Sequence, residues 1–299
     1  MAAQVRESLP SFSVDLVTGA RAHVAFLKEV HAHGLSLSRP SSESLRRYET
    51  LWLPLVAAST DSSTGPLIPP LDIAWVWHCH RLAPDAYERV CLARFDRLLD
   101  QADAAFQAQT EHGGTPPDGS ESTRRLWADM YPEEPFFLPD GPTDSTTTHE
   151  GIIEGFDVAG SAERQATFLW QVSGPRFSDE SFLRDGVINY GRFLTLMRLH
   201  PGAFLVPTYQ LDLIWHTHIL ASTKAYQADC TAITGFKHAP DHDDSVNDRS
   251  SPETKLNVST TSTRKLWLEA FGMPFGVEGG MYRGEPPSEY WSPSWVSGA

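Results

Sequence analysis

The chain contains 299 residues, of which 40% are hydrophobic, and its 24 basic and 38 acidic side chains give a formal net charge of −14. This length and composition are typical of a folded chain with one large domain or two ordinary ones, and the negative charge disfavours nucleic acid and anionic membranes as partners. No apolar run approaches the roughly 18 residues of a spanning helix, the N-terminus does not resemble a signal peptide, and the three cysteines form no CxxC pair, so we expect a cytoplasmic protein.

The first half of the sequence predicts a series of helices. Apolar residues at helical spacing mark a helix over 15–30, followed by Gly34, and a second helix that Ser41 caps and Pro54 bends or shortens. Further helices are expected over 71–82, over 85–109 as a long helix packed on one side, and around 126–130. The stretch 138–150, rich in Pro, Gly, Asp and Thr, is the expected linker to a second half.

Two Trp-His-x-His motifs lie in apolar stretches, with His78 and His80 within 71–82, and His216 and His218 within 205–220. These surroundings predict that the four imidazoles are buried, and a buried histidine needs polar partners. The motifs are 138 positions apart (216 − 78), which is the first indication of an internal duplication.

Further matches in the same order support the duplication. Phe168 repeats Phe26; Phe193, Leu196 and Met197 repeat Tyr48, Leu51 and Trp52; Tyr226 and Cys230 repeat Tyr87 and Cys91; and Thr263 repeats Thr123. We therefore predict an all-α protein of two tandem, internally duplicated helical repeats, residues 12–140 and 154–290. Because each repeat has a histidine helix in an apolar stretch, we expect the repeats to pack as one globule, with these helices facing each other about a pseudo-two-fold axis.

Several segments together resemble those of a known family. The segments are Val206 to His218, His242-Asp243-Asp244, Gly280 to Gly284 and, in the first repeat, Pro70 to His80. They are similar to conserved segments of the glycine-rich-domain-containing protein family of plants and fungi, although Gln210 stands where that family usually has Asp. The plant members carry a C-terminal glycine-rich extension that this sequence does not include. The resemblance implies a fold and the location of a site, and it implies no particular reaction.

Helical geometry separates the two histidines of each motif. Residues two apart on a regular helix point about 200° away from each other, so one histidine per repeat should face the centre. His216 has Asp212 one turn before it, where a carboxylate can bind a metal beside the ring or orient it. His218 has no carboxylate at that spacing, so we expect it to serve packing by donating to a backbone carbonyl. We therefore favour His78 with His216 as the central pair, with His80 and His218 as the alternative.

The side chains together predict a divalent transition metal, either Zn²⁺ or non-haem Fe²⁺. Besides the four motif histidines, His242 and Asp243 in an acidic loop are candidate ligands. Asp212, Tyr226 and Tyr87 are the candidate catalytic residues, the tyrosines through their hydroxyl groups.

Two hypotheses of function follow. The first is a metal-dependent enzyme that acts on a small, largely apolar substrate at a His/Asp site between the two repeats. The alternative is a non-catalytic helical binding or scaffold protein, in which the histidines form a buried polar seam. The oligomeric state stays open.

Overall fold

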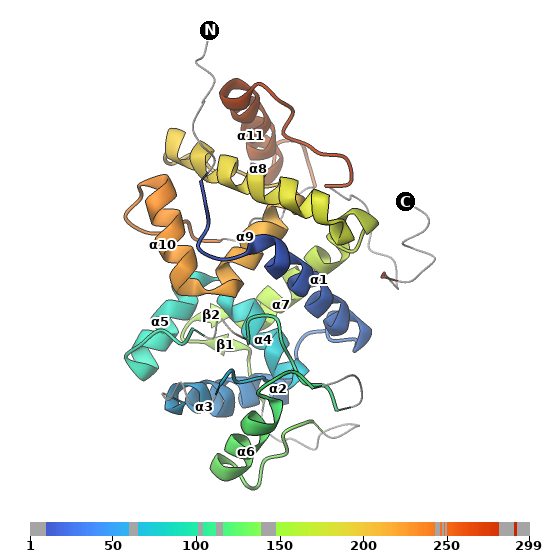
Figure 1. Cartoon of the computed structure of the whole chain (residues 1–299), viewed down its shortest axis with the longest axis vertical. Coiled ribbons are helices and arrows are strands. Elements are labelled where there is room, and N and C mark those ends of the chain that lie inside the picture. Colours follow the sequence, from blue (N-terminus) through green and yellow to red (C-terminus); the bar gives the residue numbers. More distant parts are fainter. Residues whose placement is uncertain are drawn as a thin grey trace. The chain divides into compact units, whose positions relative to one another are not determined.

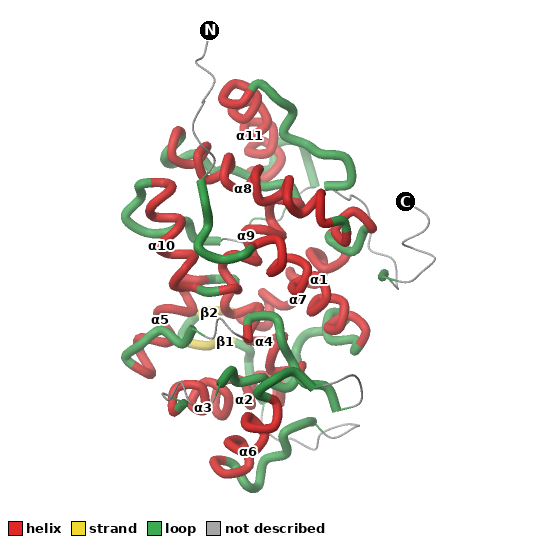
Figure 2. Tube along the Cα trace, in the orientation of Figure 1, coloured by secondary structure: helices red, strands yellow, loops and turns green. Residues whose placement is uncertain are grey.

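The structure, a computed structural model, describes residues 10–59, 65–100, 104–111, 116–138, 148–242, 246, 248, 250–280 and 290–291. Helices make up nearly all of its regular structure (Figure 2). Within these residues the strands are limited to one antiparallel pair, β1 (Ile152–Ile153) and β2 (Phe156–Asp157). The prediction of an all-α protein is confirmed. No helix in the described residues is both long enough and apolar enough to cross a bilayer.

The chain divides into two compact units, which we call the α4 unit (residues 29–166 and 220–222) and the α9 unit (residues 1–28, 167–219 and 223–299). The α4 unit contains α2 (Ser42–Arg47), the π-helical turn η1 (Tyr48–Trp52), α3 (Leu53–Ala58), α4 (Leu71–Arg81), α5 (Pro84–Phe95) and α6 (Ser120–Met130). The α9 unit contains the 3₁₀ turn η4 (Pro175–Ser178), α8 (Glu180–Leu199), nearly all of α9 (Tyr209–Ala221), α10 (Thr223–Thr234) and α11 (Lys255–Phe271). Helices α1 (Leu16–Ala32) and α7 (Val158–Gln171), both labelled in Figure 1, each contribute residues to both units.

The histidine helices α4 and α9 are buried on almost every side. In α4 every residue except Asp72 is buried, and in α9 every residue except Asp212 and Ala221 is buried. Helices α2 and α5 pack against α4, while α8 packs against α10 and α11 in the other unit. Because water does not reach most of these side chains, the polar groups on α4 and α9 need partners within the protein.

The helix predicted after Ser41 continues past Pro54. The Ser41 side chain accepts a hydrogen bond from the Ser44 backbone N–H, which caps α2 as expected. The helix then widens into η1, and Pro54 falls in the first turn of α3. A proline ring clashes with the preceding turn of a regular helix, so the wider π turn before Pro54 gives its ring room without ending the helix.

The predicted helix 85–109 is wrong over its second half. Helix α5 ends at Phe95, because Asp96 adopts a left-handed conformation with φ of 55°. Beyond it, Leu99 is buried and its carbonyl accepts a hydrogen bond from the Tyr87 hydroxyl at 2.7 Å. The spacing of apolar residues misled the prediction because a buried irregular segment uses the same residue types as a helix.

The region around the expected linker differs in detail from the prediction. The short helix expected around 126–130 begins earlier, at Ser120. Most of the linker 138–150 lies outside the described residues. It leads to the β1–β2 hairpin, which the sequence did not predict, and whose turn residues Glu154 and Gly155 both have positive φ (46° and 81°). Two such residues are typical of the type I′ turn that joins short antiparallel strands.

A tyrosine bonds the second histidine of the motif in both units. The Tyr48 hydroxyl lies 2.8 Å from His80 Nδ1, and the Tyr190 hydroxyl lies 3.1 Å from His218 Nδ1. The structure therefore aligns Tyr48 with Tyr190, 142 positions later (190 − 48). The sequence match of Tyr48 with Phe193 is wrong by about one helical turn.

Two other hydrogen bonds recur in the same way. The Trp77 indole N–H donates to the Tyr87 hydroxyl at 2.9 Å, and the Trp215 indole N–H donates to the Tyr226 hydroxyl at 3.0 Å. In each unit a backbone N–H also donates to the hydroxyl of a distant threonine at 3.0 Å, from Ile68 to Thr123 and from Val206 to Thr263. The duplication thus extends from the sequence to the bonding of buried side chains. The repeat boundaries 12–140 and 154–290 remain a prediction.

The first helix of each sequence repeat packs on the histidine helix of the other repeat. In the α9 unit, His23 of α1 is fully buried and its Nδ1 lies 3.0 Å from the Thr217 hydroxyl. In the α4 unit, the Ser161 hydroxyl of α7 donates to the Cys79 carbonyl at 3.5 Å. Cys79 and Thr217 occupy the same place in the two motifs, so the exchange of helices is reciprocal.

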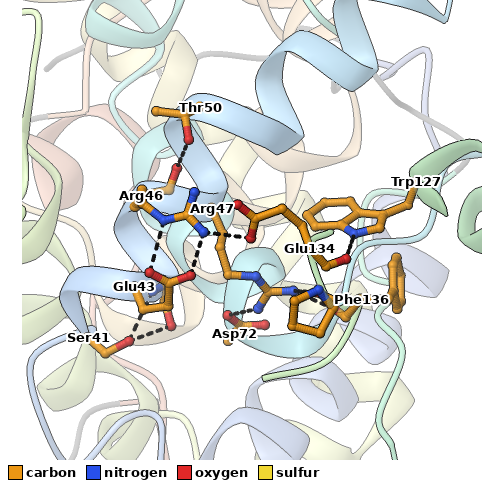
Figure 3. Close-up of polar contacts among 11 residues, drawn as sticks. Ser41, Glu43, Arg46, Arg47, Thr50, Asp72, Trp127, Glu134 and Phe136 are labelled. Carbon is orange, nitrogen blue, oxygen red and sulfur yellow. Dashed lines mark hydrogen bonds and ion pairs between the residues drawn. The ribbon is translucent and has the colours of Figure 1, made fainter. Parts of the chain in front are cut away.

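A buried arginine joins three segments of the α4 unit. Arg47 is fully buried, and its guanidinium donates to Asp72 at 2.9 Å and to the carbonyl of Phe136 at 2.5 Å (Figure 3). The guanidinium also lies 5.4 Å from the centre of the Trp127 ring. Arg46, the next residue along the helix, forms its ion pairs with Glu43 and Glu134 closer to the surface. Arg47 therefore links α2 to α4 and to the chain that follows α6.

We expect Arg47→Met to lower the free energy of unfolding by about 3–5 kcal/mol, because it leaves Asp72 and a backbone carbonyl without their buried donor. The control Arg46→Met removes partly exposed ion pairs and should cost about 1 kcal/mol or less. Urea denaturation followed by circular dichroism measures both values. Equal losses in the two variants would show that Arg47 does not hold the unit together.

Candidate metal centre

Helix α9 places Asp212 and His216 on one face. The Thr208 hydroxyl accepts from the Leu211 backbone N–H at 3.3 Å, which caps the start of the helix. Asp212 lies in the first turn, where the helix dipole favours a negative charge, and His216 follows one turn later. The His216 Nε2 atom lies 3.3 Å from Asp212 Oδ1, as the sequence predicted for this pair.

His242 approaches the same point from the loop between α10 and α11. Its Nε2 atom lies 2.8 Å from His216 Nε2 and 3.7 Å from Asp212 Oδ1. The three side chains offer ligand atoms that all lie within 4.8 Å of one another. His216 is 1% exposed, whereas the side chain of Asp212 is 18% exposed, so the cluster lies between the core and the surface.

The separations fit a common metal ion. Tetrahedral zinc with bonds of about 2.0–2.1 Å holds its ligand atoms about 3.3–3.4 Å apart, and the observed separations of 2.8, 3.3 and 3.7 Å lie on either side of that value. Two imidazoles and one carboxylate are also the ligand set of non-haem Fe²⁺ enzymes. Two imidazole nitrogens that point at one another and at a carboxylate oxygen form a compact set of donors for a divalent cation.

The electrostatics of the cluster keep Asp212 ionised. Burial is the largest influence and by itself would raise the pKa of Asp212. The charges of His216 and His242 and the hydrogen bonds from both rings outweigh burial and hold that pKa well below its usual value. The site therefore presents a carboxylate anion at neutral pH.

Aromatic rings surround the two imidazoles. The Phe168 ring centre lies 4.3 Å from that of His216, and the Trp215 ring meets His242 edge to face at 5.3 Å. Phe168 and Trp215 are both more than nine-tenths buried. They fix the planes of the imidazoles and give the cluster apolar surroundings.

The other candidate ligands lie elsewhere or outside the described residues. Asp243, the neighbour of His242, is not among the described residues. His78 belongs to the α4 unit, where it stacks on Trp75 with ring centres 5.3 Å apart. Its expected pairing with His216 stays a prediction. The first repeat has Ala74 where the second has Asp212, so α4 offers no carboxylate at the equivalent position.

His218 points away from this cluster, and its partners differ from those expected. Its Nε2 lies 3.3 Å from the Asp229 carboxylate, and its Nδ1 lies near the Tyr190 hydroxyl. The expected backbone carbonyl partner of His218 is therefore wrong: its carboxylate partner comes from α10, while position 214, one turn before it, holds an isoleucine as the sequence shows. Because a carboxylate only accepts, the ring donates through Nε2 and accepts at Nδ1. Sequence analysis missed Asp229, which directly precedes the duplicated Cys230 and which was visible only as one acidic residue on α10.

His80 has the tyrosine partner but lacks the carboxylate. The position equivalent to Asp229 is Val90, one residue before Cys91. Within the described part of the chain, His80 Nε2 is buried and has no hydrogen-bond partner, and the ring stacks on Phe156 at 5.4 Å. Burial, together with the charges of nearby arginines, lowers the pKa of His80 to about 3.

The candidate catalytic hydroxyls are used in structural hydrogen bonds. Tyr87 and Tyr226 are both fully buried. Each hydroxyl accepts from a tryptophan N–H and donates to a backbone carbonyl, that of Leu99 for Tyr87 and that of Pro240 for Tyr226. Their expected part in proton transfer stays a prediction.

Comparisons with known proteins agree on a family. A family model described as glycine-rich domain-containing protein-like matches residues 2–89 and again residues 86–229. The chain is 35% identical over 286 residues to glycine-rich domain-containing protein 2 of Arabidopsis thaliana, and 34% identical over 290 residues to glycine-rich domain-containing protein 1 of the same plant. Each match covers 92% of this chain but only 35% and 34% of the relatives, so the chain spans about a third of their length. No solved structure matches.

The low pKa of His80 predicts a pH effect on stability. The folded protein keeps His80 neutral down to about pH 3, whereas an unfolded histidine takes up a proton below about pH 6.5. The unfolded chain thus binds more protons in this window, and the free energy of unfolding falls as the pH falls from about 6.5. We expect His80→Gln to make this fall shallower, by at most about 1.4 kcal/mol per pH unit.

Urea unfolding of the variant and the wild type at about pH 7 and about pH 5 measures the effect. The control is His33→Gln, which changes an imidazole whose side chain is 42% exposed. If the free energy of unfolding of His80→Gln depends on pH in the same way as that of His33→Gln and the wild type, His80 does not remain neutral in the folded protein.

Proposed function

We propose that this chain, which belongs to the glycine-rich domain-containing protein-like family, is a metal-dependent enzyme whose metal is held by Asp212, His216 and His242. The family name specifies no chemistry, so the proposal rests on the side chains. The observation that carries it is the convergence of two imidazole nitrogens and one carboxylate oxygen within 4.8 Å.

The donor set favours zinc or ferrous iron. A structural zinc site usually has four protein ligands, whereas three ligands leave positions for water or substrate. A bound metal of this kind supplies an activated water or an open position for oxygen. Asp212, named a candidate catalytic residue from the sequence, then serves as a metal ligand.

The surroundings support a small, largely apolar substrate. Phe168 and Trp215 place apolar rings against the two histidines. The rings also exclude water from one side of the cluster, which strengthens the interaction of the anionic Asp212 with a cation. The exposed edge of Asp212 marks the side from which a substrate would approach.

We expect the chain, purified without a histidine tag, to bind about one equivalent of Zn²⁺ or Fe²⁺. His216→Gln and His242→Ala should each abolish the binding, because each removes one of three ligands. His218→Gln is the matched control, since it changes the other histidine of the same motif, which contacts Asp229 and Tyr190 instead. Elemental analysis and circular dichroism of each variant report bound metal and fold.

Two results would overturn the proposal. One is less than about a tenth of an equivalent of Zn, Fe, Cu or Mn in the wild type, not restored by added metal. The other is loss of metal, with an intact fold, in His218→Gln but not in His216→Gln. The second result would assign the chemistry to the opposite face of α9.

A second candidate function is a non-catalytic helical scaffold with structural histidines. It is favoured by the tyrosine bonds to His80 and His218, which recur in both units and, among the residues that the structure describes, belong to no cluster of possible metal ligands. In that case His78→Ala and His216→Ala should each lower the melting temperature by several degrees, while a chelator has no effect. Variants that keep the melting temperature but lose metal would contradict it.

A further inference from the structure

We infer that Tyr226 is a positioning residue of the metal site, which holds the loop that carries His242 in the place where the third ligand is needed. This inference rests on the proposed function. It gives Tyr226 a role that acts through Pro240 and Trp215 rather than through a reacting hydroxyl.

The contacts form a continuous path from α10 to the imidazole. The fully buried Tyr226 hydroxyl donates to the carbonyl of Pro240, two residues before His242. The same hydroxyl accepts from the Trp215 indole N–H at 3.0 Å. The indole ring in turn meets the His242 ring edge to face at 5.3 Å. One hydroxyl therefore fixes the backbone on one side of His242 and the ring that packs against its imidazole.

The loop needs such an anchor. Asp212 and His216 lie on one helical turn, so the helix itself fixes their spacing. His242 lies after the end of α10 at Thr234, and the described residues 235–242 that lead to it are not helical. A ligand on a free loop loses conformational entropy when the metal binds, and a loop that is already fixed loses less.

The first repeat provides a natural control for this role. There the Tyr87 hydroxyl accepts from the Trp77 N–H at 2.9 Å and donates to the Leu99 carbonyl at 2.7 Å, in the same arrangement. The α4 helix, however, has Ala74 at the position of Asp212, and the Trp77 indole meets Trp52 and Arg81 instead of a third histidine. The two tyrosines thus make equivalent hydrogen bonds, and only Tyr226 is connected to the ligand cluster.

The test compares Tyr226→Phe with Tyr87→Phe in the full chain, by Zn²⁺ titration against a competing chelator. Loss of a residue that orients a metal ligand typically weakens metal binding about 10- to 100-fold. We expect an increase of that size in the zinc Kd for Tyr226→Phe and a change of less than about twofold for Tyr87→Phe. Both variants should lower the melting temperature by similar amounts, because both lose the same pair of buried hydrogen bonds.

A further variant makes the result specific. Pro240→Gly keeps the hydroxyl and its carbonyl acceptor but loosens the backbone between them and His242. It should weaken zinc binding in the same direction as Tyr226→Phe, and it remains informative if Tyr226→Phe does not fold.

The outcomes separate this inference from the proposed function. If the wild type binds neither zinc nor any of the other metals tested above, the proposed metal site fails and this inference fails with it. If the wild type binds zinc and both tyrosine variants bind it equally well, the metal site stands and the positioning role is overturned. The role is also overturned if Tyr226→Phe is unfolded and Pro240→Gly binds zinc as the wild type does.

Discussion

The burial of the two histidine helices is the constraint on which the rest of the structure depends. A helix enclosed on nearly all sides cannot turn its polar side chains to water, so each histidine needs a partner on the side to which it points. On α9 this produces two clusters on opposite sides of one helix. His216 meets Asp212 and His242, while His218 meets Asp229 from α10. The two histidines of the Trp-His-x-His motif in α9 thus lie in two different polar clusters.

The two repeats share a scaffold and differ in their carboxylates. Each has the tyrosine that bonds the second histidine and the tryptophan N–H that bonds a second tyrosine. Only the second repeat has Asp212 and Asp229, where the first has Ala74 and Val90. The carboxylates that lie beside the motif histidines at these two positions are therefore found in one copy, while the other copy preserves the packing.

The sequence predicted what depends on local spacing. Helical periodicity was sufficient to predict the all-α fold and to place His216 and His218 on different faces of one helix. The spacing of one helical turn was sufficient to predict that Asp212 lies beside His216. The end of α5 at Asp96 and the approach of Asp229 to His218 depend on contacts between distant segments, which no local pattern encodes. The resemblance to a family marked the His242 segment, but only the folded chain brings that loop to α9.

The reciprocal exchange of α1 and α7 bears on how such a chain could arise. A single repeat folded alone would lack the contact that the first helix of the other copy makes with its histidine helix. Two separate copies could satisfy each other only as a dimer, at a strength set by their concentration. Joining the copies in one chain makes the contact intramolecular, so that it no longer depends on concentration. Two copies in one chain need not have the same sequence, so each can diverge as long as it still packs against the other.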